Sequence, residues 1–97
     1  DFVIAEDGTK MHGLALIYVL RELSGIKEFK IIQENISFTQ VQVVFINMED
    51  SKDISEKIID GLKSRLGNNV EIDVKSVTVI EPEKSGKFRY IQSKISN

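Results

Sequence analysis

Two periods in the pattern of apolar and polar residues predict how the chain begins. The strand-like runs 2–5 and 9–11 flank a turn at Asp7-Gly8, because glycine tolerates the positive φ that a tight hairpin requires. Over residues 13–23 apolar side chains recur at steps of three and four, the period of one helical face. We therefore expect a short hairpin and then a buried helix, which ends at the Ser-Gly pair that follows.

The middle of the chain predicts two strands and a second helix. Residues 26–36 and 40–48 are rich in β-branched and aromatic residues, and we expect them to pair as antiparallel strands. Apolar residues then return to helical spacing. We expect this amphipathic helix to begin at a capping pair formed by Asp53 and Glu56 and to end at Gly67.

The last third of the chain predicts one more main strand and a short terminal segment. Residues 70–80 alternate in polarity, with a change of phase near Lys75-Ser76 that is typical of a β-bulge. Pro82 ends this strand and a polar loop follows. Residues 87–95 are expected to form a short strand or an irregular tail.

This order of elements predicts an α+β fold: an N-terminal β-hairpin, then α-β-β-α-β, with two helices packed on one face of a mainly antiparallel sheet. The 97 residues suffice for one domain, residues 1–97, but not for two. Gly61 lies inside the second predicted helix, where glycine costs about 1 kcal/mol relative to alanine. We therefore expect close packing at that point.

Composition excludes several classes of function. With 13 basic and 15 acidic residues the formal net charge is -2, which argues against a general nucleic-acid binder. The chain has no cysteine and one histidine, so thiolate or histidine-rich metal sites and thiol nucleophiles are not expected. The longest nearly uncharged run, residues 11–20, is about half of what a membrane span needs. We expect a cytoplasmic protein with no membrane partner.

One dipeptide invites comparison with a phosphate-binding loop. Gly86-Lys87 resembles the end of a Walker A motif, but Glu81 stands where that motif has a glycine and Phe88 where it has a hydroxyl residue. The P-loop interpretation therefore fails. The remaining feature is Lys87, a lysine in a polar loop that is followed by Arg89. A solvated surface position is the simpler interpretation of this lysine.

His12 is the obvious candidate for a general base because its reference pKa lies near neutrality. It has no recognisable serine or cysteine partner and lies where a helix is expected to start. We therefore expect it to cap or pack at the junction of hairpin and helix.

Three segments carry a family resemblance: DFVI at residues 1–4, VTVIEP at 77–82 and SGKFR at 85–89, the last being the most specific. With the order of elements, they resemble the C-terminal domain of an adenylate-forming ligase of the phenylacetate-CoA ligase type, including relatives encoded with capsular polysaccharide genes. The chain also opens without an initiator methionine. The resemblance implies the lid domain of a larger enzyme, whose N-terminal adenylation domain would be its partner.

The resemblance also implies roles for individual residues. These enzymes convert a carboxylate and ATP to an acyl-adenylate and then pass the acyl group to a thiol, usually that of coenzyme A. Lys87 matches the family's catalytic lysine, Ser85, Gly86 and Arg89 would support the nucleotide-facing loop, and Asp1 would lie next to the hinge. ATP, Mg²⁺ and CoA would serve the full-length enzyme, while the 97-residue piece would bind none of them and be inactive by itself.

The hairpin residues Asp7, Gly8, Thr9 and Lys10 match the loop that lines the family's thiol-acceptor tunnel. The usual Arg-Gly of that loop is Asp-Gly here, so the acceptor stays open between CoA and another nucleophile. The acid substrate is also open, because the family builds its acyl pocket in the N-terminal domain.

A second interpretation needs no resemblance. The same layout suits a free-standing α+β module that binds a small ligand or a protein partner and has no catalytic activity. Exposed strand edges would in addition allow two copies to pair. The sequence upstream of Asp1 would discriminate the two interpretations.

Overall fold

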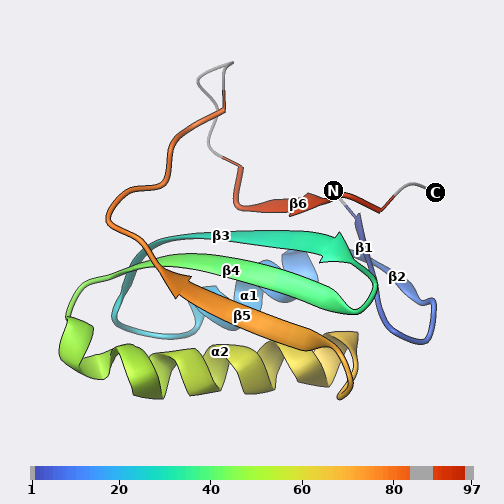
Figure 1. The fold of residues 1–97 in the computed structure, drawn as a ribbon, viewed down its shortest axis with the longest axis horizontal. Coiled ribbons are helices and arrows are strands. Elements are labelled where there is room, and N and C mark those ends of the chain that lie inside the picture. Colours follow the sequence, from blue (N-terminus) through green and yellow to red (C-terminus); the bar gives the residue numbers. More distant parts are fainter. Residues whose placement is uncertain (1, 84–88, 96–97) are drawn as a thin grey trace.

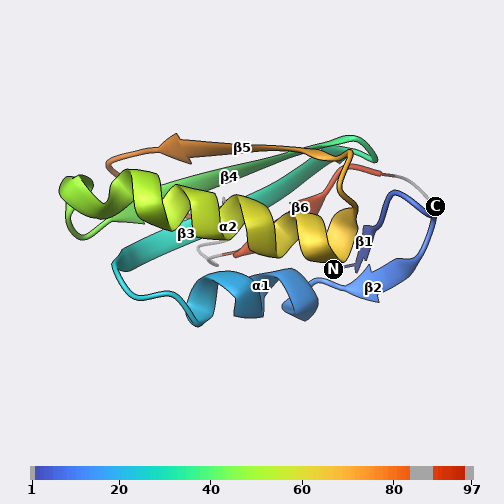
Figure 2. The same cartoon turned by 90° about the horizontal axis from the view of Figure 1, so that it is seen from below.

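Two helices lie on one face of a four-stranded sheet, with a two-stranded hairpin beside it, in the part of the chain that the computed structural model describes, residues 2–83 and 89–95 (Figures 1 and 2). The elements in chain order are β1 (Phe2–Ile4), β2 (Lys10–His12), α1 (Leu14–Arg21), β3 (Ile26–Asn35), β4 (Phe38–Phe45), the 3₁₀ turn η1 (Met48–Asp50), α2 (Ser51–Leu66), β5 (Glu71–Ser76) and β6 (Ile91–Ser93). The predicted α+β class, the hairpin and both helices are confirmed.

Helix α2 begins earlier than expected, and the predicted capping pair is wrong. The chain enters α2 through η1, where the Asn47 side chain accepts a hydrogen bond from the backbone N–H two residues on at 3.1 Å. This turn starts the helix at Ser51 and leaves Asp53 within the first helical turn. There its carboxylate pairs with the Lys57 ammonium one turn later at 3.2 Å, an exposed ion pair.

The main sheet is mixed, in the order β5-β4-β3-β6, and not mainly antiparallel. Only β3 and β4 pair antiparallel; β5 runs parallel to β4, and β6 runs parallel to β3. The reason is the connection: α2 carries the chain from the end of β4 back to the start of β5, and such a crossover makes the two strands parallel. Alternation along a strand does not reveal this, because it records only which face is buried.

The fifth strand also ends at Ser76, short of the predicted end at residue 80. The last bond to β4 runs from Val77 N–H to the Val43 carbonyl at 2.9 Å. Because β5 and β6 are the two edges of the sheet, the chain must then cross it. Ile80 is buried on this crossing segment outside any strand, so the apolar residues after Ser76 reflect packing rather than strand pairing.

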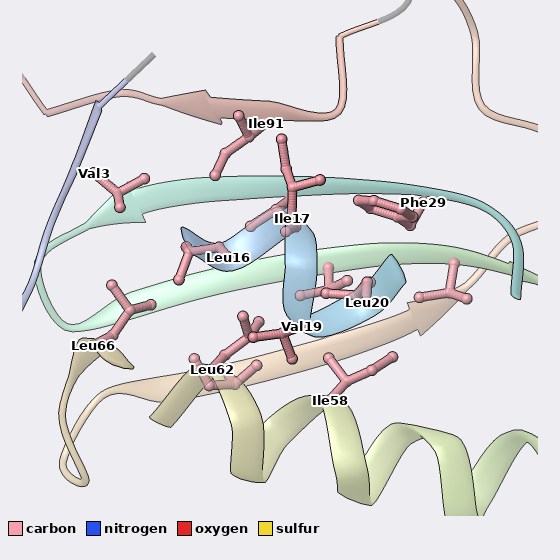
Figure 3. Packing of buried hydrophobic residues seen from close by; sticks show 14 of the residues in the cluster. Val3, Leu16, Ile17, Val19, Leu20, Phe29, Ile58, Leu62, Leu66 and Ile91 are labelled. Atoms are coloured by element: carbon pink, nitrogen blue, oxygen red, sulfur yellow. The ribbon is translucent and has the colours of Figure 1, made fainter. Parts of the chain in front are cut away.

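The core fills the space between the helices and the inner face of the sheet. Figure 3 shows side chains of α1, α2 and the strands pointing toward one another there. The residues with no exposed surface include Leu16, Ile31, Val41, Ile58 and Leu62. The predicted close packing at the α2 glycine is confirmed, since a Cβ added there would lie 2.5 Å from a methyl group of Val19.

Candidate functional site

The hairpin turn is compact and exposed. Ala5 N–H donates to the Thr9 carbonyl at 2.8 Å, and Gly8 N–H donates to the Ala5 carbonyl at 2.9 Å. Gly8 has φ 92°, which confirms the predicted use of glycine in this turn. Asp7, Thr9 and the residues around them are exposed, so the turn is accessible to a ligand or a partner surface.

Asp7 stabilises the turn through its carboxylate. The Asp7 oxygen accepts a hydrogen bond from Thr9 N–H at 2.9 Å. The side chain and the backbone of Thr9 together hold the pKa of the Asp7 carboxyl below its ordinary value of 3.8. The ionised carboxylate therefore favours the folded turn.

This lowered pKa predicts a dependence on pH. The contribution of Asp7 to the free energy of unfolding is expected to be complete above pH 3.8 and to be lost as the pH falls through the lower, folded pKa. Thermal unfolding of the wild type and of Asp7→Asn, followed from neutral to acid pH, should show the two melting temperatures converging in acid. A gap that widens on acidification would contradict this.

His12 occupies the junction of hairpin and helix. Its Nδ1 accepts a hydrogen bond from Leu14 N–H at 3.1 Å, at the start of α1, and its ring meets the ring of Phe2 edge-on at 5.5 Å. This confirms the predicted capping and packing position. On the same hairpin the Lys10 ammonium lies 4.7 Å from the centre of the Phe2 ring.

Glu6 fastens the hairpin turn to the C-terminal end of α2, and sequence reasoning did not single it out. Its N–H donates to the Leu66 carbonyl at 2.7 Å, and its carboxylate accepts from the Asn69 side-chain amide at 2.9 Å and from Asn69 N–H at 3.3 Å. A Cβ on Gly67 would collide with this carboxylate. Long-range contacts of this kind leave no periodic signal in a sequence.

The predicted lysine segment falls mostly outside the described residues. Ser85, Gly86 and Lys87 lie there, as does Asp1. Arg89 is described, and its guanidinium Nε lies 3.7 Å from the Glu83 carboxylate, so a charge pair spans the two sides of the 84–88 segment.

Glu83 and Tyr90 hold these two sides to the sheet. The Glu83 carboxylate also lies 4.0 Å from the ammonium of Lys30, on the face of β3 opposite the helices. The Tyr90 carbonyl accepts from Ile31 N–H at 2.8 Å, and the Tyr90 ring lies 5.2 Å from that of Phe29. These contacts hold the described chain on either side of residues 84–88 against β3.

A pocket of about 310 Å³ opens beside Tyr90. It lies between the end of α1 and the start of β3, and its lining includes Arg21, Lys27 and Phe29. The Arg21 guanidinium lies 5.1 Å from the centre of the Tyr90 ring, so the lining of the pocket combines a cation with an aromatic surface.

The hairpin and the residues flanking the 84–88 segment do not meet. Figure 1 shows the hairpin at one end of the sheet, whereas the chain on either side of the grey segment rises beyond the β6 edge, away from that end. Among residues 2–83 and 89–95 no cluster of three or more acidic or histidine side chains is placed to hold a metal ion. Within the same ranges no helix is long and apolar enough to cross a bilayer.

Comparisons place this arrangement among known domains. The sequence matches the family model described as the CapK C-terminal domain over residues 3–94. No curated protein matches it. Among solved structures, the fold is similar to an open conformation of 2-hydroxyisobutyryl-CoA ligase in complex with 2-HIB-AMP and CoA, with TM-score 0.66 and 13% identity over 95% of this chain. This chain spans only 21% of that ligase.

A second solved structure has nearly the same extent as this chain. It is a domain of phenylacetate-coenzyme A ligase from Bacteroides vulgatus ATCC 8482, with TM-score 0.59 and 13% identity, and the match covers 97% of this chain and 94% of that one. At this identity the two structures establish the fold, and the family model establishes the family. The chain belongs to the CapK C-terminal domain family, in agreement with its resemblance to the C-terminal domain of phenylacetate-CoA ligase-type, adenylate-forming ligases.

Proposed function

We propose that this chain is the mobile C-terminal domain of an ATP-dependent, acyl-adenylate-forming ligase that transfers the acyl group to a thiol, with CoA as the expected acceptor. The observation that carries the proposal is the family match across residues 3–94. Two CoA ligases share the fold, and in one of them the matched part is 21% of a longer chain. This favours a domain of a larger enzyme over a free-standing binding module.

Lys87 is the proposed catalytic residue of the first half-reaction. A carboxylate oxygen attacks the α-phosphorus of ATP, the bond to pyrophosphate breaks, and negative charge accumulates on the phosphoryl oxygens. A lysine ammonium is a compact charge on a flexible stem, and it stabilises that charge when it is brought close. Gly86 would let the backbone approach the nucleotide, and Ser85 and Arg89 would support the loop.

The contacts around Glu83 and Tyr90 suit this role. The Glu83–Arg89 pair joins the two sides of the lysine segment, and the Lys30 contact ties them to β3. The backbone bond from Ile31 N–H to the Tyr90 carbonyl adds a second tie on the return side. A segment held at both ends has fewer conformations to lose when its lysine engages a nucleotide.

The hairpin turn is the proposed contribution to the second half-reaction. Asp7, Gly8, Thr9 and Lys10 would line the path of the acceptor thiol after the domain has rotated. The turn is exposed, internally hydrogen-bonded and fastened to α2 through Glu6, so it can present a defined surface. Since the hairpin lies apart from the residues that flank the lysine segment, the proposal needs two domain orientations, one for each half-reaction. Rotation between the half-reactions supplies them.

The proposal assigns ATP, Mg²⁺ and the acid to the N-terminal adenylation domain, and this predicts how activity divides. The 97-residue chain alone is expected to form no acyl-adenylate from ATP, Mg²⁺ and a panel of carboxylic acids. The full-length ligase should exchange pyrophosphate into ATP with its cognate acid, and a version that ends before Asp1 should lose most of that exchange. Adenylation by the 97-residue chain alone, or full exchange after its removal, would contradict the proposal.

A further inference from the structure

A glutamine in the apolar core is the least expected side chain of the fold. Along β3 the inward positions are Phe29, Ile31 and Gln33, and the Gln33 side chain has no exposed surface. A buried amide without partners would cost a few kcal/mol. Because Gln33 occupies an inward position where an apolar residue is expected, its amide must have hydrogen-bond partners in the core.

Gln33 binds the backbone of β1 as a strand would. Its Oε1 accepts from Ile4 N–H at 3.1 Å, and its Nε2 donates to the Ile4 carbonyl at 2.7 Å. The side-chain amide thus takes the place of a peptide group. The hairpin and the four-stranded sheet are separate sheets with no ladder between them in the described part of the chain, so this amide joins β1 directly to β3.

The same amide also reaches β6. Ser93 lies beside Gln33 in the parallel β3–β6 register, and its hydroxyl donates to Gln33 Oε1 at 2.9 Å. Gln33 therefore contacts both the strand that opens the acceptor hairpin and the strand that follows the lysine segment. The charged neighbours point elsewhere: Glu34 alternates to the other face of β3 and pairs with Lys94 at 2.7 Å.

We propose that Gln33 is a positioning residue for acyl transfer to the thiol, which fixes the hairpin to the sheet so that both turn as one body when the domain rotates. The inference rests on the proposed function. Both working segments must reach the same centre in turn, and a hairpin that is loose on its sheet arrives at the acceptor path misplaced. A misplacement of about 1 Å can cost a hundredfold in rate.

Two substitutions at Gln33 test this. Gln33→Met keeps the length of the side chain and removes every hydrogen bond. Gln33→Glu keeps the shape: the neutral carboxylic acid can still donate to the Ile4 carbonyl and accept from Ile4 N–H, whereas the carboxylate cannot donate. Burial raises the pKa of the introduced carboxyl above its ordinary value of about 4.3. In this variant the bond to the Ile4 carbonyl is therefore present in acid and lost as the pH rises through the raised pKa, while the bond from Ile4 N–H can persist.

The neighbouring positions supply matched controls. Ser93→Ala removes only the β6 contact. Thr39 lies opposite Gln33 in the β3–β4 register, and its buried hydroxyl has no hydrogen-bond partner among the residues that the structure describes, so Thr39→Val changes the same row of the core without touching the tether. Removing an unsatisfied buried hydroxyl is neutral or stabilising. Thr39→Val should leave hydrogen exchange at the Ile4 amide and the rates of both half-reactions unchanged.

The first measurement is amide exchange of Ile4 in the 97-residue chain, followed by NMR. Gln33→Met is expected to speed exchange at Ile4 by about tenfold or more, because the N–H loses its acceptor. Compared with wild type at the same pH, Gln33→Glu should exchange alike in acid and settle between wild type and the methionine variant at higher pH, because the carboxylate still accepts from Ile4 N–H but no longer binds the Ile4 carbonyl. Unchanged exchange in Gln33→Met would overturn the tether itself, whatever the enzyme does.

The second measurement separates the half-reactions in the full-length ligase. Gln33→Met should lower the rate constant for acyl transfer from preformed acyl-adenylate to the thiol by about tenfold and leave pyrophosphate exchange within about twofold. Transfer by Gln33→Glu, divided by the wild-type rate at each pH, should fall as the pH rises. Equal losses in both half-reactions would show a merely structural role and overturn the proposal. If Lys87→Ala leaves adenylation intact, the proposed function fails. The amide exchange of Ile4 still tests whether Gln33 holds β1.

Discussion

Lys87→Ala in the full-length ligase is expected to lower the rate of acyl-adenylate formation by about a hundredfold to a thousandfold, the usual loss when one charge-stabilising group is removed. The transfer of a preformed acyl-adenylate to the thiol should barely change. The physical reason is that negative charge builds up at the α-phosphate only in the first half-reaction. ATP–pyrophosphate exchange measures the first step, and release of AMP from added acyl-adenylate measures the second.

Lys84→Ala is the matched control, because it removes the same charge from the same polar segment three residues earlier. It should leave both half-reactions within about twofold, since the proposal gives Lys84 no contact with the nucleotide and salt screens charges that make none. Lys87→Arg should recover only part of the adenylation rate, because a planar guanidinium does not fit the place of a compact ammonium. Equal losses of the adenylation rate in Lys84→Ala and Lys87→Ala would mean that only the overall positive charge of the segment matters. That result would contradict a catalytic role for Lys87.

Gly61→Ala is expected to destabilise the domain by up to about 2 kcal/mol, although alanine is the better helix former, because overpacking a core usually costs about 1–3 kcal/mol. The new methyl group would lie 2.5 Å from Val19 Cγ1 where α1 crosses α2, well inside the contact distance of two carbon atoms. The gain in helix propensity of about 1 kcal/mol offsets only part of this cost. Chemical unfolding of the 97-residue chain measures the difference.

Two further variants separate the clash from the backbone effect. In a Val19→Ala background the second substitution should become neutral or stabilising, and the double-mutant cycle should give a coupling that reports the contact. Gly8→Ala supplies the opposite case: nothing lies within 4 Å of its added Cβ, but Gly8 has φ +92°. Its cost of about 1 kcal/mol should not respond to Val19→Ala. A Gly61→Ala penalty that survives in that background would refute the packing explanation.

The identity and order of the elements followed from local patterns, because their causes are local. The helices appear as spacings of three and four, the β3–β4 hairpin as alternation, and the first turn as Asp7-Gly8. Gly61 was recognisable as a packing point, since a helix tolerates an interior glycine only at some cost. His12 was correctly interpreted as a junction residue because it lacks a catalytic partner in the sequence.

Two of the predictions that failed depended on distant parts of the chain, and the third on a competing local pattern. Whether β5 is parallel to β4 is decided by the path of α2, and the same alternation fits either direction. The end of β5 at Ser76 is decided by the need to cross to the far edge of the sheet. The start of α2 is decided by η1, whose cap at Asn47 competes with the more familiar pattern at Asp53.

For the candidate site, too, the sequence indicated the residues but not their long-range contacts. The segments DFVI, VTVIEP and SGKFR were enough to indicate the family, and the match over residues 3–94 agrees. They named Lys87 and the hairpin turn, because a family preserves such residues at fixed places along the chain. The contacts around these residues could not be predicted from the sequence. No local pattern indicates the ion pair of Glu83 with Arg89 or the bonds between Glu6 and Asn69.

By itself the sequence determined the α+β class, the hairpin, the two helices and the segments that carry the family resemblance, since each of these is written in neighbouring residues. Only the tertiary structure decided the strand directions and the tether at Gln33. That glutamine interrupts the inward apolar pattern of β3, and its meaning appears only when Ile4 and Ser93 are folded against it from opposite ends of the chain. A buried side-chain amide is stable when hydrogen-bonding groups surround it. The topology of the fold decides which groups these are, and the spacing of residues along the sequence does not.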